Sequence, residues 1–500
     1  MKLSRISIGN FFSLLTSITL LMLSCGMNWL PPEPLNNLPP SASAGPDKSV
    51  FINEANAITL DGSGSSDPEQ DPLTYQWELI FMLQSENGQL VEKQVAAVFE
   101  PGEQSGEYIV SPRDSVYFEP GVYYFMLTVD DGYKRSAPDI MRIDVRKPDA
   151  WVGNAGDVVL DIVKVASIQE AIDSVDNSVI RYIAVDYGTY NEIVHIRPRI
   201  NLIGLSVPDV QHNNQPVIAS VLAAEEESLV QLDEDAAIEN MRLQVLENPA
   251  LAATTVSAVK ITAAGAAVRL CTICSPLRDV PVYSDGIKIE NGCSALVKNC
   301  VINRVSGEGI EVAGSGSLEL EDSLIRSTSG SALYGYGSTL VRVTNSVIYR
   351  GGWHGIHVEN CSSVIIEHTT FADNAVDGYS GPGNHHSNLL VSGCETVIVK
   401  SSLYRLANIP VYGVYLENPA PLLTLDFRYN CLCSLQDTPL FYGGEFPAAQ
   451  AAAANYTING GAGLVNPEQN DFNPAAGSPA IGKGENGTNA GINKPLTFNY

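Results

Sequence analysis

Positive charge is scarce in this sequence. The 500 residues contain 29 Lys and Arg against 56 Asp and Glu, which gives a formal net charge of −27. This balance argues against nucleic acid or an anionic membrane surface as a direct partner, because both carry negative charge. The chain is also too long for one compact core, so we expect two or more domains.

An apolar run long enough to span a membrane is missing near the start of the chain. The run "FFSLLTSITLLMLSC" follows Lys2 and Arg5 and ends abruptly, which is typical of an export signal. Its last residues, "MLSC", resemble the lipoprotein box of bacteria. The resemblance implies a signal peptide over residues 1–24, acylation of Cys25 and a lipid anchor in the cell envelope. The residue after Cys25 is not acidic, which favours the outer membrane; the alternative is a plain cleaved signal.

Proline marks the segment that follows. Residues 25–40 include "LPPEPLNNLPP", which predicts a stiff, extended spacer between the anchor and the first domain.

Residues 41–147 have the pattern of a small β domain. Alternating strands flank a loop rich in Gly, Ser, Asp and Pro in "LDGSGSSDPEQDPLTYQW", and "PGVYYFMLTVDDG" adds another strand. These segments resemble a PKD domain, an immunoglobulin-like β-sandwich that serves as a spacer or binding module. Some members of that family bind calcium at acidic loops, which implies Asp67, Asp71 and Asp131 as candidate ligands. The alternative is that these acids only shape turns.

The rest of the chain repeats with a period in the low twenties. "DGIKIENGCSALVKNCVINRVSG" aligns without a gap with "EGIEVAGSGSLELEDSLIRSTSG", and Ile287, Ile310, Leu333 and Ile356 are each 23 residues apart. Short alternating strands at this period predict a solenoid in which each turn of the chain stacks on the last. Aliphatic residues then point inward in continuous rows, and the residues between them face water.

This pattern resembles the right-handed parallel β-helix of the pectate-lyase-like superfamily over residues 150–500. The segment "SIQEAIDSVDN" is similar to that family's entry helix, which implies that Ile168, Ala171, Ile172 and Val175 cover the first open coil. "GSPAIGKG" resembles the family's closing segment. The expected fold class is all-β: an immunoglobulin-like sandwich followed by a β-helix with an N-terminal capping helix.

Polar side chains at equivalent positions of successive coils form rows along the predicted β-helix, and each such row is called a file here. Lys298 and Glu321 are neighbours in a file of mixed charge and can form an ion pair. Another file falls at a predicted corner and contains Asn299, Asp322, Asn345, His368 and Ser401. Such side chains can hydrogen-bond from coil to coil, so His368 is interpreted as a corner residue and not a catalytic one.

Eight cysteines remain after Cys25, and several of them stack. Cys271 precedes Cys300 by one coil, and Cys361 and Cys394 share a file. Disulfides can persist outside the cytoplasm, but stacked cysteines usually act as small apolar fillers. We therefore expect free thiols, with disulfides between successive coils as the alternative.

Two histidines, in the segment "WHGIH", are the most distinctive candidates for chemistry. His357 faces outward in a file with Tyr334, on the face where related β-helix enzymes bind acidic polysaccharides. The resemblance implies a cation that neutralises a uronate and a base that removes a proton. A long polar excursion, "YSGPGNHHSN", lies nearby. The candidate catalytic residues are Arg350, His357 and Asp373, and the candidate substrate-binding residues are Tyr334, His354, Asp377, His385 and His386.

Complete catalytic motifs are missing from the predicted β-helix. It contains neither the "DD", "NTD" and "GHG" of polygalacturonase-like glycosidases nor the "DPH" of alginate epimerases. The preferred prediction is therefore a monomer that binds carbohydrate or another surface component without catalysis. The alternatives are a polysaccharide lyase or related enzyme acting on an acidic glycan, and a structural spacer of the envelope. Calcium is the one candidate cofactor.

Overall fold

The chain divides into two compact units, Met1–Arg146 and Lys147–Tyr500. The predicted signal peptide, Cys25, Asp377 and His385 lie outside the described residues. No helix in the described part of the chain is long and apolar enough to cross a membrane. The computed structural model describes residues 37–45, 47–51, 58–86, 89–93, 97–99, 107–110, 121–153, 162–205, 215–222, 227–246, 255–274, 283–375, 386–406, 412–417, 424–434, 441–442, 455–459, 462–492 and 496.

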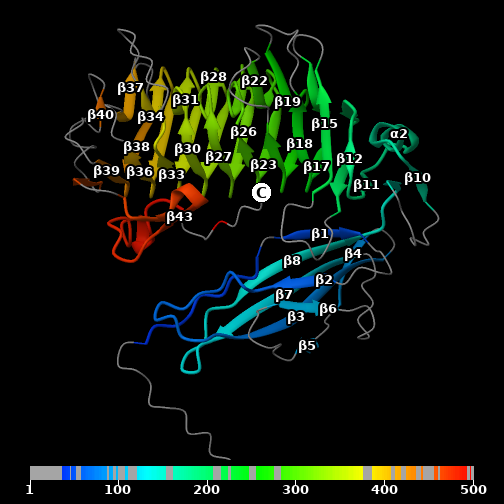
Figure 1. Cartoon of the computed structure of the whole chain (residues 1–500), viewed down its shortest axis with the longest axis horizontal. Helices are drawn as coiled ribbons and strands as arrows, with labels where there is room; N and C mark the ends of the chain where they lie inside the picture. Colours follow the sequence, from blue (N-terminus) through cyan, green and yellow to red (C-terminus); the bar gives the residue numbers. More distant parts are fainter. Residues whose placement is uncertain are drawn as a thin grey trace, which may run out of the picture. The chain divides into compact units, whose positions relative to one another are not determined.

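The described strands of the first unit form two sheets (Figure 1). The larger sheet has the order β1-β8-β7-β3-β4, and β5 also pairs with β3. The smaller sheet is the antiparallel pair of β2 and β6. The strands are β1 (Lys48–Phe51), β2 (Ile58–Asp61), β3 (Thr74–Glu86), β4 (Gln89–Lys93), β5 (Ala97–Phe99), β6 (Glu107–Val110), β7 (Gly121–Asp130) and β8 (Asp139–Arg146).

Alternation along β7 builds the core of this unit. Tyr123, Phe125 and Leu127 are fully buried and the residues between them are half-buried. They pack with Trp77 of β3 and Ile143 of β8 in one apolar cluster. One face of the sheet is therefore apolar, as the period of two in the sequence predicts.

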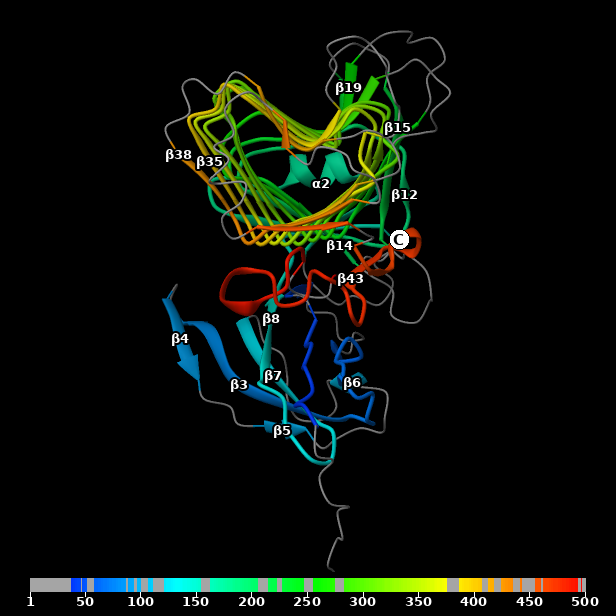
Figure 2. The ribbon, with the colours of Figure 1, turned by 90° about the vertical axis from the view of Figure 1, so that its left-hand side faces the viewer.

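The second unit is a stack of coils whose strands form three parallel sheets (Figure 2). The first sheet contains β10 (Val163–Val165), β9 (Ala150–Val152), β11 (Arg181–Val185), β14 (Ile200–Gly204), β17 (Ala237–Glu239), β20 (Ala266–Arg269), β23 (Ser294–Lys298), β26 (Ser317–Glu321), β29 (Leu340–Thr344), β32 (Ser363–Glu367), β35 (Thr396–Lys400) and β38 (Thr424–Arg428). The second sheet contains β12 (Thr189–Tyr190), β15 (Val217–Val221), β18 (Arg242–Leu246), β21 (Thr272–Cys274), β24 (Val301–Asn303), β27 (Leu324–Thr328), β30 (Val347–Gly351), β33 (Thr370–Ala372), β36 (Leu403–Leu406), β39 (Cys431–Ser434) and β41 (Tyr456–Asn459). The third sheet contains β13 (Val194–Ile196), β16 (Ser228–Leu232), β19 (Thr255–Ile261), β22 (Tyr283–Ile289), β25 (Ile310–Ala313), β28 (Leu333–Tyr336), β31 (His354–Glu359), β34 (Ser387–Ser392), β37 (Tyr412–Glu417) and β40 (Phe441–Tyr442).

The predicted inward row is present in the third sheet. Ile287 pairs with Ile310, Ile310 with Leu333, and Leu333 with Ile356, and all four side chains are fully buried. Identical spacing in successive coils thus places like residues over like residues, and the stacked apolar side chains form one continuous core.

The corner between the first and second sheets follows the predicted polar file. Residues at this corner have a left-handed backbone, with φ of 54° at Asn299, 45° at Asn345 and 50° at His368. Asn, Asp and Gly tolerate this conformation best. The amide of Asn345 donates to the carboxylate of Asp322, one coil away, at 2.7 Å. His368 is a corner residue, as predicted, and the predicted pair Lys298–Glu321 is formed at 3.1 Å.

A ladder of hydroxyl groups follows directly after this corner. Ser323 and Ser346 are fully buried, and the backbone N–H of Ser323 donates to Oγ of Ser346 at 3.2 Å. The N–H of Thr369 donates in the same way to Oγ of Ser402 at 3.3 Å. These contacts satisfy backbone groups that the corner removes from the sheets.

Helix α2 (Ile168–Ser174) lies at the end of the stack where the first coils begin (Figure 1). Its side chains Ile168 and Ile172 are buried in the same core as the coils. The carboxylate of Glu192 accepts hydrogen bonds from the backbone N–H groups of Ile168 and Gln169 at 2.9 and 3.1 Å. A helix of seven residues is too short to be stable alone, so these contacts hold it in place.

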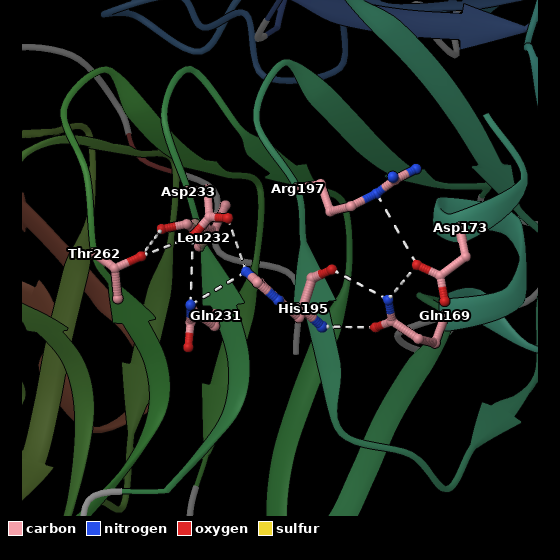
Figure 3. A network of polar contacts seen from close by, with 8 residues as sticks. All are labelled: Gln169, Asp173, His195, Arg197, Gln231, Leu232, Asp233 and Thr262. Carbon is pink, nitrogen blue, oxygen red and sulfur yellow. Dashed lines mark hydrogen bonds and ion pairs between the residues drawn. The ribbon is translucent and has the colours of Figure 1, made fainter. Parts of the chain in front are cut away.

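The side-chain amide of Gln169 pairs with the first strand of the third sheet. Its Oε1 accepts from the backbone N–H of His195 at 2.8 Å, and its Nε2 donates to the carbonyl of His195 at 3.4 Å (Figure 3). These are the two kinds of hydrogen bond that a further strand would make, so the amide satisfies the open edge of β13.

The segment 462–492 runs along the outer surface of the second sheet (Figure 1). Phe472 and Ile492 pack on Val347 and Tyr349, so the outward residues of this sheet are apolar and covered. This segment contains β42 (Leu464–Asn466), which pairs antiparallel with β43 (Asp471–Pro474), and the short 3-10 turns η1 (Pro467–Gln469) and η2 (Glu485–Gly487).

The eight cysteines after Cys25 are free thiols in this structure. Cys271 and Cys300 are buried in the core, and Cys361 and Cys394 are buried one coil apart. Cys271, Cys300, Cys361 and Cys394 all belong to the apolar core of the coils, as their stacking predicts.

Candidate functional site

The strands of the third sheet bend at one position in the described coils. At this position two consecutive residues face the core, as Gly355 and Ile356 do in β31. Gly286 is the equivalent residue of β22, and it also faces the core, because a Cβ atom on it would lie only 2.7 Å from Cγ2 of the core residue Ile302. The residues on either side of such an inward pair both face outward. Side chains three positions apart therefore share one surface.

Two files of outward side chains result, which we call the bend file and the strand file, and together the paired-file face. The ring centroids of His354 and His357 are 5.0 Å apart, and those of Tyr412 and Tyr415 are 5.7 Å apart, so the two files converge. The bend file contains Asp285, Glu308, Ser331, His354, Ser387 and Tyr412, and the strand file contains Lys288, Glu311, Tyr334, His357, Leu390 and Tyr415.

Side chains of the bend file accept hydrogen bonds from the next coil. Oδ1 of Asp285 accepts from the backbone N–H of Glu308 at 2.8 Å. Nδ1 of His354 accepts from the backbone N–H of Ser387 at 3.3 Å. An imidazole that accepts at Nδ1 carries its proton at Nε2 and is neutral.

Each coil contributes one rung to the face, made of one residue from each file, and carboxyl groups dominate the first rungs. Asp285 is 3% exposed, and burial raises its pKa to about 7 despite the hydrogen bond from Glu308. Burial, together with the charge of Asp285, raises the pKa of Glu308 to about 8. Two buried carboxyl groups on neighbouring rungs disfavour each other's charge, so part of the pair is protonated at neutral pH.

Aromatic rings occupy the following rungs. The ring centroids of Tyr334 and His357 are 5.0 Å apart, and those of His354 and His386 are 6.1 Å apart. Burial lowers the pKa of His354 to about 3 and also lowers the pKa of His357, although Glu359 lies 2.6 Å from Nε2 of His357. The structure therefore brings together four of the predicted site residues, Tyr334, His354, His357 and His386, as an aromatic cluster.

Arg350 and Asp373 lie elsewhere. Arg350 lies near the end of β30 and Asp373 directly follows β33, so both are at the corner after the second sheet, in one file as the repeat predicts. The guanidinium of Arg350 is 2.8 Å from the carboxylate of Glu468, and Asp373 is 3.3 Å from Nε of Arg405. Among the described residues, neither makes a hydrogen bond, ion pair or ring contact with the aromatic cluster.

Two of the three calcium candidates, Asp67 and Asp131, bind the backbone of their own turns. Oδ1 of Asp67 accepts from the backbone N–H groups of Glu69 and Asp71 at 2.9 and 3.0 Å. Oδ1 of Asp131 accepts from the N–H groups of Tyr133 and Lys134, both at 2.6 Å. Within the described ranges, no group of three or more His, Cys, Asp and Glu side chains is placed to hold a metal ion. Asp67, Asp71 and Asp131 are thus not gathered into one ligand set.

A second polar group lies at the start of the same outward file. Nε2 of His195 is 2.8 Å from Oδ2 of Asp233, whose Oδ1 accepts from Oγ1 of Thr262 at 2.9 Å (Figure 3). Gln231, which pairs with His195 in the sheet, also contacts Asp233 at 3.3 Å. The file of His357 therefore begins several coils earlier, with an imidazole that a carboxylate orients.

Sequence reasoning missed Asp285 and Glu308. In "DGIKI" and "EGIEV" each acid stands two residues before an inward Ile, where strict alternation predicts an inward side chain. An acid at an apolar position, followed by glycine in both repeats, was the signal that the strand bends there.

A family model described as "Right handed beta helix region" matches residues 257–420. This match and the three parallel sheets identify the second unit as a right-handed parallel β-helix. Among curated proteins, Dyslexia-associated protein KIAA0319 of Homo sapiens is 31% identical over 115 residues, which are 23% of this chain and 9% of the human protein.

Several solved structures are similar at low identity. Pectin methylesterase PemA from Erwinia chrysanthemi has a TM-score of 0.32 and 16% identity, with 66% of this chain and 99% of that chain covered. The A-module of the mannuronan C-5 epimerase AlgE6 of Azotobacter vinelandii has a TM-score of 0.34 and 14% identity, with 59% and 93% covered. These values describe a coarse likeness and not a shared site.

Proposed function

We propose that the paired-file face binds a carbohydrate chain without cleaving it. The observation that carries this proposal is the register of the two files, which repeats polar and aromatic side chains on successive coils. Coils are about 4.8 Å apart, so the six rungs offer a straight row of contacts for a linear polymer.

The side chains on these rungs match the chemistry of sugars. Tyr334 and Tyr412, which are half-buried, combine a flat apolar ring with a hydroxyl group, and carboxyl groups such as Glu311 accept hydrogen bonds from hydroxyl groups. Trp353, which is 49% exposed, directly precedes β31 and adds another exposed aromatic side chain to this part of the chain. A sugar polymer presents alternating apolar faces and hydroxyl edges, which fits such a row.

A second candidate is a carbohydrate-active enzyme, such as a polysaccharide lyase. The observation that favours it is the pair Asp285 and Glu308, because burial raises both pKa values to near neutrality. Groups with such pKa values can donate and accept protons at neutral pH. A structural spacer without a ligand remains the third candidate.

The rest of the chain would present this face outside the cell. We propose that the protein is exported and attached by an acyl group on Cys25 to the bacterial cell envelope, at the outer membrane. Residues 41–147 would be a PKD-like sandwich that acts as a stalk, and α2 would cap the β-helix. The proposed partner is a polysaccharide or another surface component, and the proposed state is a monomer.

Binding and cleavage can be separated in one set of measurements. The purified full-length chain is titrated by calorimetry with neutral, acidic and amino polysaccharides, and the products are assayed for unsaturated and reducing ends. Tyr334→Ala should weaken binding about tenfold, since aromatic anchors dominate such contacts. Arg342→Ala is the matched control, because Arg342 faces outward from β29 on the first sheet. If new chain ends form with the wild-type protein and not with His357→Ala, the protein is an enzyme and the non-catalytic proposal is wrong. If Tyr334→Ala and Arg342→Ala have equal affinities, the paired-file face is not the binding surface.

A further inference from the structure

The acidic rungs of the paired-file face have carboxylates in excess of cations. Lys288 lies 3.5 Å from the carboxylate of Glu311, and Lys260, one coil earlier in the same file, lies 3.1 Å from that of Glu290. Both lysines are thus already paired. Asp285 and Glu308 form no direct ion pair with a lysine or arginine within the described residues, and Lys288, which acts on Asp285 from a greater distance, is already paired with Glu311.

Both carboxyl groups sit in spaces that glycine provides. A Cβ atom on Gly307 would clash with Oδ1 of Asp285, and a Cβ atom on Gly330 would lie 2.7 Å from Cδ of the Glu308 carboxyl group. Each acid therefore rests over a glycine of the next coil. The arrangement is built into the coil and is not a chance approach of flexible acids on a surface.

Two polar atoms at this place are buried without a well-formed hydrogen bond. Oε2 of Glu308 is buried and makes no hydrogen bond within the described part of the chain. Oγ of Ser331, which is 1% exposed and stands next to Glu308 in the bend file, also makes no well-formed hydrogen bond there. Ser331 nevertheless lies close enough to the Glu308 carboxyl group to oppose the rise of its pKa. Buried polar atoms without hydrogen bonds cost free energy. A ligand that donates a hydrogen bond to each of these two atoms would remove that cost and bind more tightly as a result.

Building on the carbohydrate-binding function proposed above, we infer that this face selects a glycan with free amino groups and disfavours polyuronates. An ammonium group donates three hydrogen bonds and supplies the missing positive charge beside Asp285 and Glu308. A uronate carboxylate at the same rung would bring a third negative charge close to Asp285 and Glu308, which already disfavour each other's negative charge. The preferred substrate class is therefore basic rather than acidic.

The pKa values of Asp285 and Glu308 agree with a preference for a positively charged ligand. Asp285 faces the charged groups of Glu308, Glu311 and Lys288, and Glu308 faces Asp285, Glu311 and the ring of Tyr334. Burial raises the pKa of both acids, to about 7 and about 8. A bound ammonium group lowers both values, so binding at neutral pH releases protons. This release is measurable as a dependence of the binding enthalpy on the ionisation enthalpy of the buffer.

The test uses three oligomers of equal length with the full-length chain: a β-1,4-linked glucosamine oligomer, its fully N-acetylated form and a galacturonic acid oligomer. The free-amine oligomer should bind about tenfold or more tightly than the acetylated one, since a hydrogen bond to a charged group contributes about 1.4 kcal/mol or more. The galacturonic acid oligomer should bind more weakly than both.

Glu308→Gln is the informative variant, because the amide resembles the protonated acid and keeps an acceptor oxygen. It should remove the preference for the free amine and the proton release, while the acetylated oligomer binds as before. Glu319→Gln, at an exposed acid on β26, is the matched control and should change neither. Unchanged binding of the acetylated oligomer also shows that the variant is folded.

The outcomes separate the two proposals. Equal binding of the amino and acetylated oligomers, both weakened by Tyr334→Ala, would overturn the amino-sugar preference and keep the carbohydrate-binding face. Tighter binding of the galacturonic acid oligomer would do the same. No binding of any oligomer, or binding that Tyr334→Ala leaves unchanged, would overturn the proposed function itself.

Discussion

The carboxylate of Asp285 accepts a hydrogen bond from the backbone N–H of Glu308, one coil further along the β-helix, at 2.8 Å. His354 makes the same coil-to-coil bond to Ser387 through its ring nitrogen. At Asp285 and His354, the structural position just before the bend of the third sheet thus needs an acceptor for the N–H of the next coil. Because Asp and His both meet that need, the chemistry of this file can vary from coil to coil while the fold stays the same.

The double variant Asp285→Asn with Glu308→Gln should remove a pH dependence of stability. Burial raises both folded pKa values, to about 7 and about 8, above those of the unfolded chain. The folded state then binds more protons than the unfolded state between about pH 4 and about pH 8, so stability is complete at low pH and falls as the pH rises.

Chemical denaturation at about pH 5 and about pH 8 measures this effect. Relative to the double variant, the wild-type free energy of unfolding should fall by an amount on the order of 1–3 kcal/mol across that interval. Parallel pH profiles of the two proteins would contradict the buried carboxyl pair.

His354 should remain neutral, with its proton on Nε2, well below the usual range for histidine. Burial and the neighbouring His357 and His386 lower its pKa to about 3. The unfolded chain binds a proton near about pH 6.5, so this group lowers stability as the pH falls from there toward about 3. Nitrogen NMR of selectively labelled histidine, assigned with His354→Gln, reports the tautomer directly; a charged ring at about pH 5 would refute it.

Phe472→Ala should release the C-terminal segment from the second sheet. Phe472 is 1% exposed, and its ring centroid lies 5.1 Å from that of Tyr349. Loss of this packing should cost about 3 kcal/mol or more of local stability. Hydrogen exchange should accelerate in 462–492 and stay unchanged in β31. Val465→Ala is the control, since Val465 is 52% exposed and its truncation should change little.

Arg350→Ala should have a small effect that is confined to the same segment. The guanidinium is 38% exposed and pairs with Glu468, and exposed ion pairs contribute about 0–1 kcal/mol. Glycan affinity should not change, because Arg350 makes no contact with the aromatic cluster in the described structure. A tenfold loss of affinity or of any cleaving activity would return Arg350 to the site that the sequence suggested for it.

Ser346→Ala should destabilise the stack from its interior. Oγ of Ser346 accepts from the N–H of Ser323 and donates to the carbonyl of Thr344 at 2.9 Å, and the side chain is fully buried. Leaving a buried N–H without its acceptor should cost about 1–3 kcal/mol. Thermal unfolding measures the loss, with Ser363→Ala as control because Ser363 faces outward on β32.

The repeat made most of the β-helix predictable. A period of 23 residues determines which residues pair, so the inward row of Ile287 and the outward file of Tyr334 and His357 follow from counting alone. The corner at His368 and the ion pair of Lys298 with Glu321 follow from the same register. Stacked coils repeat one geometry, and for this reason local spacing predicts contacts over long distances.

The composition of the site was less accessible to sequence reasoning. Arg350 and Asp373 share a file as counted, yet their charges are taken by Glu468 and Arg405. Glu468 belongs to a segment more than a hundred residues away that has no repeat, and no register predicts where it packs. The sequence pattern therefore identified the correct rungs but could not tell which side chains remain available to a ligand.

The sequence by itself determined that the chain winds into stacked coils and which residues lie over one another, because a regular period leaves one pairing that buries every apolar row. Only the tertiary structure decided that Asp285 and Glu308 face outward beside Lys288 and Glu311. A bend of the backbone at Gly286 and Gly309 turns two consecutive residues inward, and this bend is a property of packed coils rather than of the alternation along a single strand.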